Sequence, residues 1–124
     1  MIAVDTSSFV AFLAAHPGDD VDLVTTLLHG DEIVFPPVVL SEIVSAPNLE
    51  ARVEGMIVKI PLLEITSGYW DRAGRLRARM ISVGWNVSLA DTLIAQCCLD
   101  HGVTLVTRDK GFKPFERHAG LRLR

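Results

Sequence analysis

The chain has 124 residues, a length that predicts a single domain over residues 1–124. Its net charge of −3 at pH 7 gives no support for a generally basic nucleic-acid-binding protein. No apolar run approaches the ~20 residues of a membrane-spanning helix, and the acid in the opening MIAVD argues against a secretory signal. We therefore expect a cytoplasmic protein that does not contact a membrane.

Apolar residues make up 49% of the sequence, which is high for a small soluble chain, whereas aromatic residues make up only 6%. A domain of this size has a large surface for its volume. We therefore expect a partner, such as a second copy of the chain, to cover part of the apolar surface. Cys97 and Cys98 are sequence neighbours and are poorly placed for a disulfide or a metal site, so we interpret them as reduced core residues.

Short strand patterns alternate with helical patterns along the chain. Proline, glycine and capping residues mark the helix ends; Asn48, for example, can cap a helix that contains Leu49. In chain order we expect a strand at 2–4, helices at 5–13 and 20–29, a strand at 32–35, helices at 36–44 and 48–57, a strand at 62–65, helices at 69–83 and 88–101, a strand at 104–106, a short helix or turn at 110–117, and an edge strand at 121–123. This alternation predicts an α/β fold with a parallel sheet covered by helices.

Four acidic residues fall where strands end and helices begin, which is the edge of a parallel sheet where ligands bind. Asp5 follows the first strand, Glu42 lies one turn into the helix after the second, and Asp109 follows the strand at 104–106. Asp91 stands at the start of a helix whose N-terminus could face the same edge.

Each of these acids also has an ordinary structural interpretation. Ser88-Leu-Ala-Asp91 fits the capping box, in which a serine caps the helix and the acid reaches back to it. Asp5 and Asp109 could each cap a helix, and Glu42 could be a solvated helix residue. A capping role explains one position at a time, however, and does not predict that four acids share one edge.

Clustered carboxylates repel one another and favour a bound cation. Oxygen ligands without histidine or cysteine indicate Mg²⁺ or Mn²⁺ rather than zinc. Such an ion can activate water against a phosphodiester, which predicts metal-dependent hydrolysis. Arg108 and Lys110 flank Asp109 and could hold the phosphates of a nucleic acid, whereas a group on the helix at 69–83 that includes Arg75 and Arg79 could equally be a solvated face.

Four stretches, VDTSSF, LSEIV, SLADTLIA and LVTRDKGF, together resemble the motifs of PIN domains, and most closely the VapC-type toxins of bacterial and archaeal toxin–antitoxin pairs. The resemblance spans nearly the whole chain. It implies a three-layer α/β/α sandwich with a short, mainly parallel central sheet, and a metal-dependent endoribonuclease that acts as the toxin of a type II pair. It further implies a homodimer, RNA as substrate, and silencing by an antitoxin whose segment occupies the active-site groove.

By this resemblance, Asp5, Glu42, Asp91 and Asp109 are the catalytic quartet that binds Mg²⁺ or Mn²⁺, and Ser7 and Thr107 match hydroxyl positions that support those carboxylates. Many relatives carry a further acid two residues after the last aspartate, where this chain has Gly111. A receiver domain and a D-x-D phosphatase do not fit, because only one acid follows the first strand. The alternative is a PIN-like module that binds RNA or a partner without cleaving.

Overall fold

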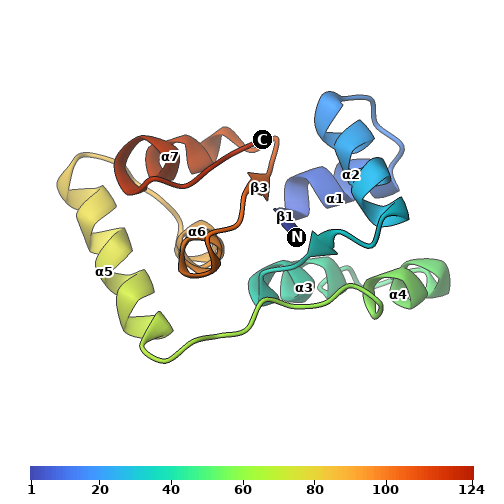
Figure 1. Cartoon of the computed structure of the whole chain (residues 1–124), viewed down its shortest axis with the longest axis horizontal. Coiled ribbons are helices and arrows are strands. Elements are labelled where there is room, and N and C mark those ends of the chain that lie inside the picture. The colour runs from blue at the N-terminus through green and yellow to red at the C-terminus, as the bar shows by residue number, and fades with distance from the viewer.

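The computed structural model describes residues 1–124 and has helices packed on both faces of a small parallel sheet, a three-layer α/β/α arrangement (Figure 1). This confirms the predicted fold class. The elements are β1 (Ile2–Val4), α1 (Thr6–Leu13), α2 (Asp19–His29), β2 (Ile33–Val34), α3 (Pro37–Val44), α4 (Ala51–Ile57), α5 (Tyr69–Ser82), α6 (Leu89–His101), β3 (Leu105–Val106), the 3-10 helix η1 (Lys110–Phe112) and α7 (Lys113–Ala119).

The sheet has the strand order β2-β1-β3, with β1 in the centre and both pairings parallel. Ala3 is opposite Val34 on one side and opposite Leu105 on the other. Because the strands are parallel, the carboxyl ends of all three lie at one edge. Residues that follow β1 and β3 are thereby brought next to each other.

Two predicted strands are wrong as continuous strands. Of the segment 62–65, only Leu62 pairs, in an isolated parallel bridge with Phe35. Of the segment 121–123, only Leu123 pairs, with Leu105. Each segment lies at an outer edge of the sheet and pairs with it through one residue only, so neither forms a continuous strand.

The helix predicted from Asn48 is also shorter than expected. α4 begins at Ala51, and Glu50 occupies the N-cap position without a side-chain capping bond. Asn48 and Leu49 therefore lie outside the helix, and the predicted cap is wrong. The helix predicted at 110–117 is divided into η1 and α7, and its second part begins at Lys113-Pro114, where proline suits a first turn.

One cluster of 27 buried residues forms the core between the sheet and the helices. Phe9 and Phe35 meet edge to face in it, with their ring centroids 5.0 Å apart. Cys97 and Cys98 are free thiols within this core, as expected. No helix has both the length and the apolar character needed to cross a membrane.

The helices divide between the two ends of the molecule. α5 packs against α6 and α7, and all three lie together in Figure 1, whereas α2 and α4 lie at the opposite end. α1 and α3 are in contact, and α3 also contacts α6. α3 therefore contacts both α1, which follows β1, and α6, which carries Asp91.

Candidate active site

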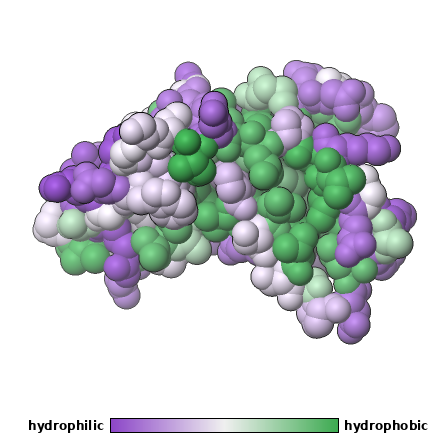
Figure 2. Space-filling view, turned by 90° about the horizontal axis from the view of Figure 1, so that it is seen from below, coloured by the Kyte–Doolittle hydropathy of each residue, from purple (hydrophilic) through white to green (hydrophobic).

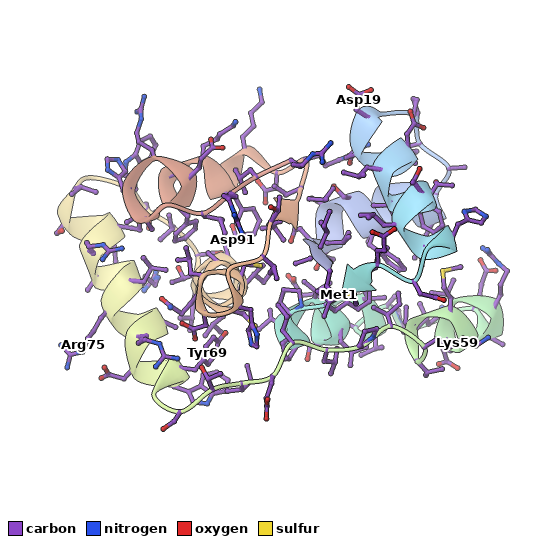
Figure 3. All side chains as sticks on the ribbon, in the orientation of Figure 1. Met1, Asp19, Lys59, Tyr69, Arg75 and Asp91 are labelled. Carbon is purple, nitrogen blue, oxygen red and sulfur yellow. The ribbon has the colours of Figure 1, made fainter.

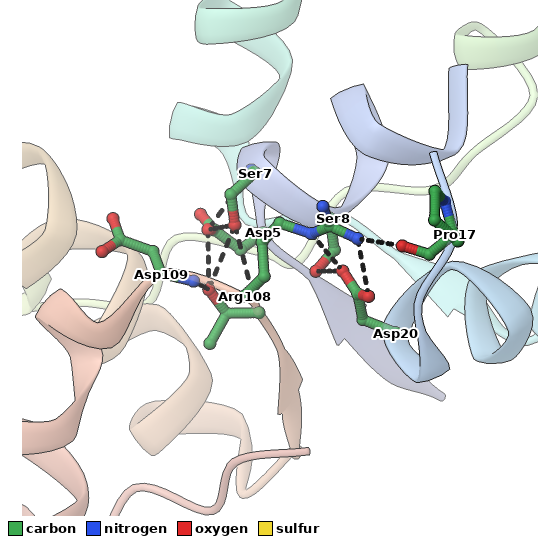
Figure 4. A network of polar contacts seen from close by, with 8 residues as sticks. Asp5, Ser7, Ser8, Pro17, Asp20, Arg108 and Asp109 are labelled. Atoms are coloured by element: carbon green, nitrogen blue, oxygen red, sulfur yellow. Dashed lines mark hydrogen bonds and ion pairs between the residues drawn. The ribbon is translucent and has the colours of Figure 1, made fainter. Parts of the chain in front are cut away.

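Asp5 is the most enclosed of the four acids and is only 4% exposed. Its backbone N–H donates to the Val106 carbonyl over 2.9 Å, which fixes Asp5 beside the end of β3. Its Oδ2 atom accepts hydrogen bonds from Ser7 Oγ (2.6 Å), Ser7 N (3.3 Å) and Thr107 Oγ1 (2.9 Å) (Figure 4). All three bonds end on Oδ2, so the carboxylate is oriented while Oδ1 stays available to a ligand.

Thr107 links two of the acids. The same hydroxyl that donates to Asp5 accepts a hydrogen bond from the Asp109 backbone N–H over 3.0 Å. Asp109 is the N-cap of η1, where its Oδ1 accepts from Gly111 N over 2.8 Å. Ser7 and Thr107 therefore both hydrogen-bond to Asp5, and their role in supporting metal ligands stays a prediction.

Glu42 projects from α3 and is exposed. Its Oε1 accepts a hydrogen bond of 2.6 Å from the hydroxyl of Thr6, the first residue of α1. Our sequence reasoning did not single out Thr6, although it follows Asp5 directly in VDTSSF. This bond ties Glu42 to the helix that starts at Asp5.

Asp91 lies in the first turn of α6, and the capping pattern is only half formed. Ser88 Oγ accepts a hydrogen bond from Asp91 N over 3.0 Å, but the Asp91 carboxylate makes no return bond to the Ser88 backbone N–H. Burial, reinforced by the charges of Asp109, Asp5 and Glu42, raises the pKa of Asp91 to about 6. The four predicted acids therefore act on one another electrostatically.

Gly111 lies between two of these carboxylates. A Cβ atom at this position would stand 3.0 Å from Asp109 Oδ1 and 3.2 Å from Asp91 Oδ2, closer than ordinary contact. A side chain here would push on both carboxylates. Both carboxylates would have to shift by a few tenths of an ångström to accept a side chain at this position.

The donor set suits a hard divalent cation. Four carboxylates come from four different elements, and none of them belongs to any of the five ion pairs in the protein. No group of three or more His, Cys, Asp or Glu side chains already has the geometry of a closed metal cluster. Carboxylate oxygens are the donors that Mg²⁺ and Mn²⁺ prefer, and metal binding by these acids stays a prediction.

The sequence of residues 2–118 matches the PIN domain family. The chain belongs to the PIN-domain family. Solved structures support the same fold for this PIN domain. It superposes with a TM-score of 0.75 on a chain of DNA-bound VapBC from Salmonella typhimurium, at 21% identity and covering 100% of this chain and 98% of that one.

Two other solved structures are similar to this PIN domain. A chain of VapBC2 from Rickettsia felis, bound to a promoter DNA fragment, gives a TM-score of 0.74 at 23% identity, with 100% and 98% covered. VapBC-1 from nontypeable Haemophilus influenzae gives 0.73 at 19% identity, with 100% and 97% covered. A search of curated proteins finds no significant match.

The basic residues that were predicted to hold substrate differ in their ion pairs and in how they lie relative to the four acids. The guanidinium of Arg108 turns to Asp20, donating to both its carboxylate oxygens over 2.8 and 2.9 Å (Figure 4). Lys110 belongs to no ion pair and lines a hollow that Asp91 also lines.

The arginines of α5 lie elsewhere. Arg75 pairs with Asp71 over 2.8 Å and points outward from α5, away from Asp91 (Figure 3). Arg75 and Arg79 line a different hollow of about 470 Å³, which none of the four acids reaches. A substrate-binding role for these two arginines stays a prediction. Lys110 is the better candidate for that role, because it lines the same hollow as Asp91.

Proposed function

We propose that this PIN domain is a Mg²⁺- or Mn²⁺-dependent endoribonuclease and the toxin of a type II toxin–antitoxin pair. One observation carries the proposal. Asp5, Glu42, Asp91 and Asp109 belong to no ion pair, and burial, reinforced by the charges of the other three acids, raises the pKa of Asp91 to about 6. Bound Mg²⁺ or Mn²⁺ would supply Lewis-acid activation of water and of a phosphodiester.

The side chains of this site have separable tasks in the proposed reaction. Asp5 is the fixed ligand, because Ser7 and Thr107 hold its Oδ2 and leave Oδ1 free. Asp91 and Asp109 complete the donor set from α6 and from the loop after β3, and Glu42 approaches from α3. Lys110 holds a phosphate of the RNA backbone, since it is the unpaired cation nearest to Asp109 in the sequence.

The toxin assignment rests on the family and on the solved complexes that share its fold, which contain VapBC pairs. We accordingly propose an antitoxin protein and a second copy of the chain as partners in the cytoplasm. Figure 2 shows apolar side chains gathered on the face that carries α3 and α4. An apolar hollow there could receive one of these partners, and it is lined by Leu40, Val44, Ile57, Val58, Ile60 and Leu62.

RNA cleavage by the purified protein tests the enzymatic proposal. We expect cleavage with Mg²⁺ or Mn²⁺, none in EDTA, and a loss of at least 100-fold for Asp91→Asn, in keeping with removal of a metal ligand or its support. Asp22→Asn is the matched control, because Asp22 is also in a first helical turn but is exposed and distant in sequence from the four acids. Cleavage that persists in both EDTA and Asp91→Asn would contradict the metal mechanism.

A PIN-like module that binds RNA or a partner without cleaving is the second candidate. It is favoured by one observation, namely that no three acids are already closed into a metal cluster. The same assay separates the two. RNA binding without cleavage of any RNA, in either metal, would support the non-cleaving module.

A further inference from the structure

A hollow of about 340 Å³ opens directly beside Asp91 and has a tryptophan in its wall. The residues that line it include Trp85, Asn86, Asp91, Lys110 and Lys113. Its volume is at the lower end of the range for ligand pockets, about 300–1,000 Å³. One wall thus belongs to the proposed metal site, and the others offer an aromatic ring, an amide and two lysines.

Trp85 is exposed, yet it is held in place. Its indole Nε1–H donates to His118 Nε2 over 3.0 Å, and its backbone N–H donates to the Met80 carbonyl over 2.9 Å. The loop continues into buried Val87, whose carbonyl accepts from Arg77 Nε over 3.0 Å. Hydrogen bonds therefore hold the Trp85 ring and the backbone on both sides of it, while 37% of the residue remains exposed.

The charges around the ring suit a polyanion. Lys110 belongs to no ion pair, and Lys113 has only a 3.5 Å contact with Glu116, in which the side chains are 66% and 44% exposed. A second hollow of about 310 Å³ shares Trp85 and Lys113 and adds Arg117 and one acid, Glu116. Basic side chains therefore border the indole on two sides, although the whole chain has a net charge of −3.

Resting on the proposed ribonuclease function, we propose that this hollow, the Trp85 pocket, takes one unpaired base of the RNA next to the cleaved phosphate. The base stacks on Trp85, and Lys110 and Lys113 contact the flanking phosphates. Stacking on an aromatic ring is possible only for a base that has left a duplex. The pocket therefore selects single-stranded or looped RNA, and it does so independently of metal.

The chain has two tryptophans, which allows a direct test of this pocket. Trp70→Phe leaves Trp85 as the only indole. In EDTA, where the RNA stays intact, we expect a short single-stranded oligoribonucleotide to quench its fluorescence, and a duplex of the same length to quench it much less. Absence of quenching at RNA concentrations that saturate binding would overturn the proposal, including the case in which the pocket receives a protein side chain instead.

Binding affinity gives a second readout. Trp85→Ala should weaken single-stranded RNA binding about 5- to 100-fold, the range for loss of one base–aromatic stack. Trp85→Leu keeps the apolar bulk of the loop and should weaken binding similarly, which separates stacking from folding. Trp70→Ala is the control, since Trp70 is 65% exposed on α5 and packs on Tyr69. Unchanged affinity in both Trp85 variants would refute the pocket.

The two proposals can fail separately. Cleavage by the wild type without quenching refutes only the Trp85 pocket. Quenching and weakened binding in the Trp85 variants, without cleavage in any metal, refutes only the ribonuclease and leaves an RNA-binding pocket.

Discussion

Thr107 forms hydrogen bonds to two of the acids and so fixes their positions relative to each other. Its hydroxyl donates to Asp5 Oδ2 and accepts from the Asp109 backbone N–H, so one side chain orients the Asp5 carboxylate and the start of the turn that carries Asp109, both proposed as metal ligands. Groups that orient metal ligands in this way commonly affect metal affinity nearly as strongly as the ligands do.

We therefore predict that Thr107→Val lowers Mn²⁺ affinity and RNA cleavage about 10- to 100-fold, while lowering the free energy of unfolding by only about 1 kcal/mol. Titration calorimetry and urea denaturation would measure the two effects. Thr25→Val is the matched control, because its hydroxyl bonds only to the Val21 carbonyl within α2. Equal Mn²⁺ affinity in the two variants would contradict this role of Thr107.

At the scale of elements, the loop after β3 is tied to α2. Arg108 donates to both oxygens of Asp20, and the fully buried hydroxyl of Ser8, on α1, donates to Asp20 Oδ2 over 2.8 Å. Hydrogen bonding from Arg108 lowers the pKa of Asp20 to about 2. Asp20 thus joins α1, α2 and the loop that precedes Asp109.

Asp20→Ala should lower the free energy of unfolding at pH 7 by about 1–3 kcal/mol, because it leaves the Ser8 hydroxyl buried without its acceptor. The ion-pair part of this loss depends on pH. Since the folded-state pKa lies below the ordinary 3.8, the stabilisation is present above pH 4 and is lost as the pH falls toward 2. Urea denaturation between pH 2 and 7 would measure it, and Asp22→Ala should show neither effect.

The order of the elements could be predicted from the sequence because each short strand and each helix has its own local pattern. What could not be predicted depends on partners far away in the chain. Leu62 and Leu123 have strand-like neighbours, but the sheet offers each only one bridge. Arg108 adjoins Asp109 in the sequence, yet its guanidinium forms an ion pair with Asp20, which lies 88 residues away in the chain.

The candidate site also has features that a local sequence pattern predicts and features that depend on distant residues. The strand-to-helix rule predicted that Asp5, Glu42 and Asp109 share one edge, and Asp91 was added because the start of its helix could face that edge. In the structure the charges of the other three acids reach Asp91. Their role as metal ligands stays a prediction. Thr6 could not be selected, because its bond to Glu42 joins two helices whose packing no local pattern specifies.

For the whole molecule, the unpaired acidic site should make stability depend on both pH and metal. The folded-state pKa of Asp91, about 6, lies above its ordinary 3.8. Its contribution therefore favours the folded state at low pH and is lost as the pH rises from about 4 through about 6. A cation that binds only the folded protein would restore this stability.

We predict that in EDTA Asp91→Asn raises the Tm at pH 7.5 but not at pH 4, where wild-type Asp91 is already protonated. We also predict that Mn²⁺ raises the Tm of the wild type at pH 7.5 and has little effect on Asp91→Asn. Scanning calorimetry would check both statements, with Asp22→Asn as a variant expected to follow the wild type. A Tm increase from Mn²⁺ that is the same in Asp91→Asn would place the metal elsewhere.

The contact between Asp5 and Thr107 spans 102 residues, and the central strand β1 finds β3 only near the end of the chain. A ribosome releases β1 first, so this side of the sheet cannot form until β3 has been synthesised. Any nascent or prematurely ended chain that stops before β3 lacks Thr107 and Asp109 together. Translation itself therefore keeps the acidic site unassembled until residues 105–109 have been made.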